Sequence, residues 1–421
     1  MKKPLEDIRI LDLTAWLSGP YAMEIAAYLG AEVIKIEKVD GGDAVRANGP
    51  YYGPRGIVFE RSDPRDLSLC ILKRARGRKS ITLNLQTEKG REIFRRLVRI
   101  SDVVAENFMP GVMDRLGIGY QELKKIKPDI ILCSISGFGQ DGPYRNLAAF
   151  DPVVEAMSGV MEVTGFPDSP PVRLGVAAGD MVAALYMMIG LLAALRYREK
   201  TGKGQTVDIS MMDGLFSFLL DEALDVYVER GIPIRTGNRR IRLTPFNSYR
   251  AKDGWVVICS AADSHWANLL KAMGREDLLD DPRYKRLDQR MANADEVDAL
   301  VESWTMTKSK NEVVEIVRKH GVASGIVATI PEVLSDPQLI HRGMIVDLIH
   351  PELGKVQGAV AHDIPVRLSE SKGGFDMPAP YLGAHNEEIY CGLLGYSLDD
   401  LRQLEKEGVI TSPPVRTGGK P

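Results

Sequence analysis

Asp180 stands directly before a long apolar run, in the segment GVAAGDMVAALYMMIGLLAALRYREKTGKGQ over residues 175–205. A carboxylate in this position is expected to cap a helix by accepting the free N–H groups of the first turn. The positive end of the helix dipole then favours the ionised form of the carboxylate. Two interpretations remain open from the residues alone: a helix cap, or a carboxylate nucleophile.

The apolar run over 181–195 indicates the kind of helix that follows this carboxylate. Charged residues follow it at once, in RYREK over 196–200, and the run is too short to cross a bilayer. We therefore expect a helix that is buried on nearly all sides inside a large protein, with Asp180 at its amino end.

Strands and helices alternate through residues 1–150, and this alternation predicts how candidate groups are positioned. Segment 8–37 has the pattern of a strand, a helix and a strand, and further strand patterns follow in ITLNL, DVVAENF and PDIILCSISGFG. The alternation predicts an α/β fold with a mostly parallel sheet that helices cover on both faces. Asn107 lies just past the carboxyl end of its strand, at the edge where parallel sheets bind ligands. Glu106 either orients a substrate there or packs at the sheet edge.

The turn after the first strand argues against a dinucleotide site. Glu37 ends the second strand where a ribose-binding acid would stand. The turn itself has the sequence TAWLSGP over 14–20 and lacks the glycines that let a backbone approach a pyrophosphate. We therefore expect no NAD.

Five basic residues lie within residues 73–79, KRARGRK, immediately before a strand. Such a cluster is often a solvated face. Its place beside the open end of the first strand-helix-strand unit also suits a polyphosphate ligand. The residues leave both interpretations open.

Composition excludes several classes of protein. With 44% hydrophobic residues, 26% charged residues and a net charge of −3, nothing favours a nucleic-acid or membrane partner. The four cysteines lie far apart, which argues against structural zinc and disulfides. The six histidines do not cluster with acidic residues, so no metal site is expected. No apolar segment of a signal peptide precedes the first strand, and we expect a cytoplasmic protein.

Eight segments resemble the class III CoA-transferases, a family that includes formyl-CoA:oxalate and carnitine CoA-transferases and α-methylacyl-CoA racemase. They are LDLTAWLSGPYA, LGAEVIKIE, GRKSITLNL, ENFMPGVMDRLGIGY, GFGQDGPY, the GD pair at 179–180, LAALRYREKTGKGQTVDISMMD and LGAHNEEI. Their order and spacing cover nearly the whole chain. The resemblance implies that Asp180 is the nucleophile.

The resemblance implies reversible CoA transfer from an acyl-CoA to a carboxylic acid, with the CoA thioester as substrate and no permanently bound cofactor. The carboxylate attacks the thioester to form a mixed anhydride, and the released thiolate then forms an aspartyl-CoA thioester. The oxyanions need N–H donors, and the first turn after Asp180 is one expected source.

The resemblance also implies a CoA site. Its expected residues are Ala15, Trp16, Ser18, Lys38, Arg78, Lys79, Asn107, Arg115, Phe150 and Asp151. Other interpretations stay open for three of them: Lys38 as a surface lysine, Arg115 as part of a helix-surface ion pair, and Asp151 as the cap of the helix PVVEAMSG.

Three departures from the family pattern bear on the substrate. Leu17 replaces the glutamine of formyl-CoA transferase, and residues 259–263, CSAAD, replace its glycine-rich loop. A bulkier acid than formate or oxalate is therefore favoured, with succinyl-CoA as donor and a bulky or aromatic acceptor as a guess. Phe150 stands where the racemases carry a histidine base, so a racemase or epimerase is disfavoured because proton exchange needs two bases. A non-catalytic CoA-binding subunit of a heteromeric transferase is the other alternative.

The expected architecture is a Rossmann-like large domain with an inserted small α+β domain. We expect residues 1–205 to form the first part of the large domain, 206–239 a linker, 240–330 the small domain, and 331–421 a linker and the return to the large domain. The tail 412–421 is rich in Pro and Gly and is expected to be disordered. The resemblance implies an interlocked homodimer.

Overall fold

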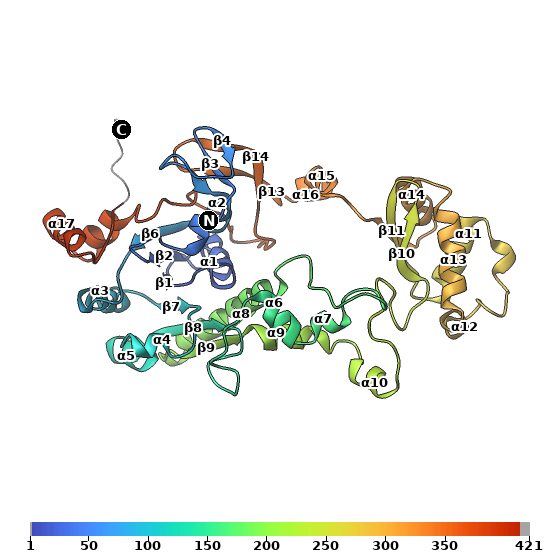
Figure 1. Ribbon diagram of the computed structural model, residues 1–421, viewed down its shortest axis with the longest axis horizontal. Coiled ribbons are helices and arrows are strands. Elements are labelled where there is room, and N and C mark those ends of the chain that lie inside the picture. The colour runs from blue at the N-terminus through green and yellow to red at the C-terminus, as the bar shows by residue number, and fades with distance from the viewer. Residues whose placement is uncertain (1, 413–421) are drawn as a thin grey trace. The chain divides into compact units, whose positions relative to one another are not determined.

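The computed structural model describes residues 2–412, and a six-stranded sheet forms the centre of the larger of two compact units (Figure 1). Every strand pair in this sheet is parallel. The strand order is β6 (Arg78–Thr82), β2 (Glu32–Glu37), β1 (Arg9–Asp12), β7 (Val103–Glu106), β8 (Ile131–Ser136) and β9 (Thr206–Ser210). This is the order of a doubly wound sheet, which reverses between β1 and β7. The predicted parallel α/β sheet is confirmed.

Helices cover both faces of this sheet because the strand side chains are apolar on both faces. Strand residues such as Leu11 and Ile34 share one apolar core with helices that include α3 (Glu88–Arg99), α5 (Tyr120–Ile126), the π-helix Glu388–Leu393 and α17 (Leu398–Lys406). On the other side, α1 (Ser18–Tyr28) packs against α8 (Ala178–Thr201), and α8 packs against β8 and β9.

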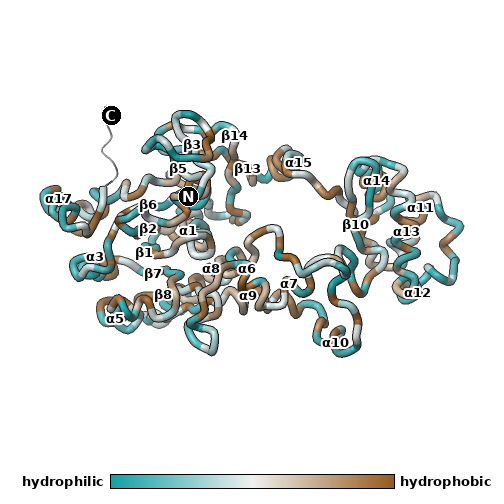
Figure 2. Tube along the Cα trace, in the orientation of Figure 1, coloured by the Kyte–Doolittle hydropathy of each residue, from teal (hydrophilic) through white to brown (hydrophobic). Residues whose placement is uncertain are grey.

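Helix α8 differs from the expected fully buried helix. Hydrophobic residues run along it (Figure 2), and by length and composition alone it could cross a membrane. Ala183, Met187 and Leu191 are buried in the contact with the sheet and α1, as in a core helix. Ile189, however, is 62% exposed, and Leu185 and Leu192 are exposed beside it. The expectation of burial on nearly all sides was wrong, because one apolar face of α8 is uncovered in the single chain.

Smaller elements complete the larger unit. They are β3 (Tyr51–Gly53), β4 (Gly56–Val58), β5 (Leu67–Ser68), α2 (Leu69–Arg74), α4 (Val112–Arg115), α6 (Asp151–Met157), α9 (Met211–Leu219), β13 (Ile345–His350) and β14 (Gly354–His362). Strands β3, β4 and β5 form one antiparallel sheet, and β13 pairs with β14. Helix α2 packs against β13, and both belong to a separate apolar cluster that contains Leu72 and Leu348.

The second compact unit consists of 159–174 and 219–337. Its sheet has the strand order β10 (Phe246–Ala251), β11 (Gly254–Cys259) and β12 (Ala323–Ile326). Its helices are α7 (Val160–Val163), α10 (Leu224–Glu229), α11 (Asp263–Met273), α12 (Leu287–Ala292), α13 (Ala294–Thr305), α14 (Lys310–Lys319) and α15 (Ile330–Leu334). Helix α16 (Pro337–His341) begins at the boundary of this unit. The predicted hairpin is β10–β11. The second unit has its own apolar core, which contains Trp266 and Val297.

One predicted boundary differs from the structure. Residues 206–210 are not a linker but β9, the sixth strand of the parallel sheet, and α9 continues the same unit. Composition alone did not reveal this, because an edge strand and a linker are both short and partly polar. Of the tail predicted to be disordered, residues 413–421 lie outside the described residues.

A buried ion-pair network lies at the carboxyl end of β2. Glu37 accepts two hydrogen bonds from Arg46, both at 2.7 Å, and one from the Ser80 hydroxyl at 2.6 Å. Lys35 pairs with Asp43 at 2.9 Å. Burial raises the pKa of Glu37, but the charge and hydrogen bonds of Arg46, followed by Lys35 and Ser80, lower it more, to about 2. The network joins β2 to β6 and to the loop that follows β2.

We predict that Glu37→Gln lowers the free energy of unfolding at pH 7 by about 3 kcal/mol, because Arg46 is then buried without its carboxylate. The folded pKa of Glu37 lies below its ordinary value, so this contribution is present above about pH 4.5 and is lost as the pH falls towards 2. Urea unfolding at pH 7 and pH 3.5 measures the difference. Glu32→Gln, whose partly exposed side chain pairs with Arg9 and Lys79, is the control and should cost less than Glu37→Gln. Equal losses in the two variants would contradict the prediction.

Candidate functional site

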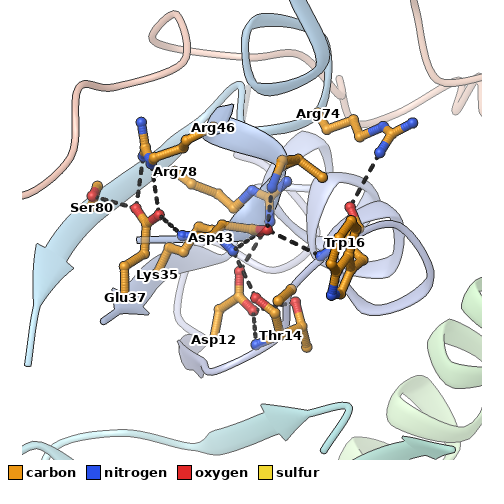
Figure 3. A network of polar contacts seen from close by, with 12 residues as sticks. Asp12, Thr14, Trp16, Lys35, Glu37, Asp43, Arg46, Arg74, Arg78 and Ser80 are labelled. Carbon is orange, nitrogen blue, oxygen red and sulfur yellow. Dashed lines mark hydrogen bonds and ion pairs between the residues drawn. The ribbon is translucent and has the colours of Figure 1, made fainter. Parts of the chain in front are cut away.

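Side chains bind every backbone N–H and C=O group of the turn Thr14–Trp16, which follows β1. Figure 3 shows the contacts of Thr14 and Trp16 with Asp12, Lys35, Asp43 and Arg74. The partners are Asp12 for the Thr14 N–H (2.9 Å), Lys35 for the Thr14 carbonyl (2.7 Å), Asn107 for the Ala15 N–H (2.9 Å) and carbonyl (2.8 Å), Asp43 for the Trp16 N–H (3.2 Å) and Arg74 for the Trp16 carbonyl (3.2 Å). Trp16 has a φ of 70°, in the left-handed region that costs energy for a residue with a side chain. The six bonds hold the turn in this conformation.

Asn107 reaches this turn because β1 and β7 are neighbours at the reversal of strand order. Its side-chain amide accepts the Ala15 N–H and donates to the Ala15 carbonyl, and its nitrogen lies 3.5 Å from the Ser18 hydroxyl. The sequence predicted Asn107 at the ligand edge of the sheet, and it lies there. In the described structure it positions the turn, and its contact with CoA stays a prediction.

Two exposed aromatic rings lie beside this turn. The Trp16 ring is 45% exposed and the Phe150 ring is 64% exposed. Their centroids are 6.0 Å apart, in an edge-to-face arrangement. Since large apolar rings are seldom left exposed together, this pair offers a surface for the hydrocarbon part of a ligand.

The carboxylate of Asp151 caps helix α8. Its Oδ1 accepts the N–H groups of Gly179 at 2.8 Å and Asp180 at 3.3 Å. Asp180 therefore lies in the first turn of α8 and not at its N-cap, which is Ala177. Asp151 itself lies in the first turn of α6, after Phe150 as N-cap. The expectation that Asp180 caps its own helix was wrong: the cap comes from a residue 29 positions earlier.

Asp180 combines partial burial with an elevated pKa. Burial, followed by the negative charge of Asp151, raises the pKa of Asp180 to about 6. Hydrogen bonds from the hydroxyl and N–H of Ser18 and the charge of Arg74 act in the opposite direction. The helix dipole was expected to keep the carboxylate ionised, but burial and Asp151 outweigh it. Asp180 is still mostly ionised at pH 7, and it is a stronger base than an exposed aspartate.

The first turn of α8 has no free N–H group for an oxyanion. Asp151 occupies those of Gly179 and Asp180, the N–H of Ala178 bonds to the Val176 carbonyl, and that of Met181 bonds to the Ala177 carbonyl. The expectation that this turn supplies the oxyanion donors is therefore not supported by the described structure.

The remaining predicted residues divide into two groups. Lys38 and Arg115 are exposed, on the loop after β2 and at the end of α4, so both remain available to a ligand. Arg78 is 1% exposed and pairs with Asp12 at 3.0 Å. Lys79 pairs with Glu32, the first residue of β2, and with Glu388. In the described structure Arg78 is buried under the turn and Lys79 is directed to the amino edge of the sheet, and the contact of either residue with CoA stays a prediction.

Three residues of the site were missed: Lys35, Asp43 and Arg74. Lys35 and Glu37 alternate with apolar residues inside a strand of a sheet covered on both faces, and such buried charges must have partners. This signal in EVIKIE predicts an ion-pair network, although not its partners. Nothing in the sequence separates Arg74 from the other four basic residues of 73–79.

We predict that Asp151→Asn lowers the pKa of Asp180 from about 6 towards its ordinary value. The amide oxygen still accepts the two N–H groups of α8, while the negative charge is lost. Carbon-13 NMR titration of carboxyl-labelled aspartate measures this pKa, with Asp180→Asn to assign the signal. Asp40→Asn, in the exposed loop after β2, is the charge-matched control and should leave the pKa unchanged. An unchanged or higher pKa in Asp151→Asn would contradict the assigned role of Asp151.

Comparisons with known proteins agree on one family. The profile of CoA-transferase family III matches residues 5–386. The chain is 39% identical to the succinyl-CoA–D-citramalate CoA-transferase of Chloroflexus aurantiacus, over 97% of this chain and 98% of that protein. It is also 39% identical to the acetyl-CoA:oxalate CoA-transferase of Acetobacter aceti, over 91% and 92%. The crystal structure of a CAIB/BAIF family protein from Brucella suis superposes with a TM-score of 0.80 at 34% identity, over 93% of this chain and 100% of that chain. The chain belongs to CoA-transferase family III, and it is an enzyme of the CoA-transferase class.

Proposed function

We propose that the enzyme moves CoA reversibly between two carboxylic acids through covalent intermediates on Asp180. The observation that carries this proposal is the half-buried Asp180 carboxylate, with a pKa of about 6, which accepts hydrogen bonds from Ser18 next to the fully bonded turn Thr14–Trp16. Such a carboxylate is ionised at neutral pH and incompletely solvated, which favours nucleophilic attack.

The proposed reaction has four balanced steps. The Asp180 carboxylate attacks the thioester carbonyl, and CoA leaves as a thiolate, which gives an acyl-aspartyl anhydride. The thiolate attacks the aspartyl carbonyl and releases the donor acid, which leaves an aspartyl-CoA thioester. The acceptor carboxylate then attacks this thioester and releases the thiolate again. The thiolate finally attacks the acceptor acyl group, and the new acyl-CoA departs with Asp180 restored.

The acids are proposed to be small carboxylic acids. The names of relatives specify citramalate, oxalate, and succinate with glutarate, each for the relative concerned. None of these acids is aromatic, so the sequence-based guess of an aromatic acceptor gains no support from them. Phe150 cannot act as a base, which argues against a racemase.

Two arginines support a CoA phosphate site next to Asn107. Gly111 has a φ of 78°, in the turn between β7 and α4. A methyl group on Gly111 would lie 3.3 Å from a terminal nitrogen of Arg115 and 3.9 Å from one of Arg145. Both arginines are exposed, and two guanidinium groups around one turn suit a phosphate dianion.

The expected homodimer stays a proposal. It is supported by the uncovered apolar face of α8, with Leu185, Ile189 and Leu192. A second copy of the chain is the proposed cover for this face, and sedimentation of the intact protein measures this association directly. A cytoplasmic location is likewise proposed.

We predict that incubation with a suitable acyl-CoA and no acceptor produces an adduct of CoA mass on Asp180. Intact-protein mass spectrometry detects it, and hydroxylamine cleavage followed by peptide mapping locates it. Asp180→Asn should give no adduct and lower transfer activity by at least about 10³-fold, because the amide is not a nucleophile. Full activity of Asp180→Asn, or an adduct on another residue, would overturn the proposed mechanism.

We predict that Arg115→Gln and Arg145→Gln each raise the KM for acyl-CoA about tenfold with little change in kcat, because an interaction with CoA itself is the same in the ground and transition states. The increase should shrink for a pantetheine thioester, which lacks the phosphates of CoA. Lys124→Gln, at an exposed side chain of α5, is the charge-matched control. A loss of kcat with an unchanged KM would argue against phosphate binding.

A further inference from the structure

Arg74 differs from the basic residues that follow it in the same stretch. Arg76 is buried and pairs with Glu24, while Arg78 and Lys79 pair with Asp12 and Glu32. Arg74, the last residue of α2, is partly exposed, and its guanidinium group donates one hydrogen bond to the Trp16 carbonyl at 3.2 Å. Within residues 2–412 its guanidinium has no ion pair and no second hydrogen bond. An arginine has five N–H donors, so four of them are available to a ligand.

The position of Arg74 brings this charge to the reacting centre. It holds the carbonyl of Trp16, and two residues later the hydroxyl and N–H of Ser18 bond to the Asp180 carboxylate. The charge of Arg74 also lowers the pKa of Asp180, which requires the two groups to be within Coulombic reach. Figure 3 shows the guanidinium group beyond the Trp16 carbonyl, away from the buried network of Lys35 and Glu37.

The turn that Arg74 binds also carries an exposed aromatic ring. Trp16, whose carbonyl Arg74 binds, meets Phe150 edge to face at 6.0 Å. A cation bonded to the backbone of Trp16, two exposed apolar rings on and against the same turn, and the Asp180 carboxylate match an acid that has a hydrocarbon segment and a second negative charge.

We propose that Arg74 binds the free carboxylate of a dicarboxylic acyl group while the other carboxyl carbon reacts at Asp180. Trp16 and Phe150 then contact the carbons between the two ends. The inference rests on the proposed function and names the substrate class of the same site. A guanidinium group is suited to this task because it binds a carboxylate through two parallel hydrogen bonds.

The test compares thioesters that differ by one carboxylate: succinyl-CoA with butyryl-CoA, and glutaryl-CoA with pentanoyl-CoA. The rate of adduct formation on Asp180 is followed by mass spectrometry without acceptor. In the wild type at least one dicarboxylic thioester should react about tenfold faster than the monocarboxylic thioester with which it is paired. Arg74→Gln should slow that thioester about 30-fold and change the monocarboxylic partner less than threefold. Arg74→Lys should recover part of the loss.

Lys73→Gln is the matched control, since it removes one positive charge from the neighbouring position of α2 and should preserve the preference. An equal loss for both thioesters of a pair would overturn the inference, because Arg74 would then only hold the Trp16 turn. A higher KM for all CoA thioesters alike would identify a CoA contact and would also overturn it. The inference would also be overturned if the wild type reacted no faster with succinyl-CoA or glutaryl-CoA than with the paired monocarboxylic thioester. In each of these cases the adduct on Asp180 still forms, and the proposed function stands. If no thioester labels Asp180 in the wild type, the proposed function itself fails.

Discussion

The site depends on the hydrogen bonding of the turn Thr14–Trp16. Trp16 occupies a left-handed backbone conformation that its side chain disfavours, so the turn persists only because side chains from four other segments hold it. Lys35 is central to this arrangement, since it binds the Thr14 carbonyl and pairs with Asp43, which in turn accepts the Trp16 N–H. Buried charges are costly without partners, which makes such a network stable only when it is complete. The geometry of the ligand-binding edge is therefore set by ion pairs inside the sheet and not by the turn itself.

Asp180 shows how two carboxylates share one helix end. Asp151 takes the hydrogen bonds that the end of α8 offers, so the helix dipole and its N–H groups stabilise Asp151 more than Asp180. Asp180 is left with Ser18 and with the negative charge of its neighbour, and its pKa rises to about 6. A strongly stabilised carboxylate would be a poor nucleophile, whereas a fully buried one would be protonated at neutral pH. The observed arrangement lies between these limits, which suits the proposed attack of Asp180 on a thioester and its later release.

The sequence predicted the elements of the sheet and the residues that follow its strands, because strand patterns and the parallel-sheet edge are local properties. Asn107, Trp16, Ser18, Phe150, Asp151 and Asp180 do lie together. The ion pairs of Arg78 and Lys79 could not be predicted because their partners, Asp12 and Glu32, come from other strands, and the pairing of a charge depends on sheet register rather than on its neighbours in the chain. The same reason hid the role of Asp151, whose bond to Asp180 spans two helices. Resemblance to a family identified positions, whereas the direction of each side chain required the fold.

Helix α8 connects Asp180, the proposed nucleophile, with the uncovered surface of the chain. Its amino end is fixed by Asp151, its buried face packs on the sheet and α1, and its other face exposes Leu185, Ile189 and Leu192. A helix transmits displacement along its axis because its backbone bonds are continuous. Exposed apolar residues on a helix that is otherwise a core element are costly in water, and covering them with a second copy would fix the helix from the side opposite the sheet. In that arrangement subunit association would also hold Asp180 at its distance from Ser18 and Arg74, so dimerisation and the reactivity of the carboxylate would be linked through one rigid element.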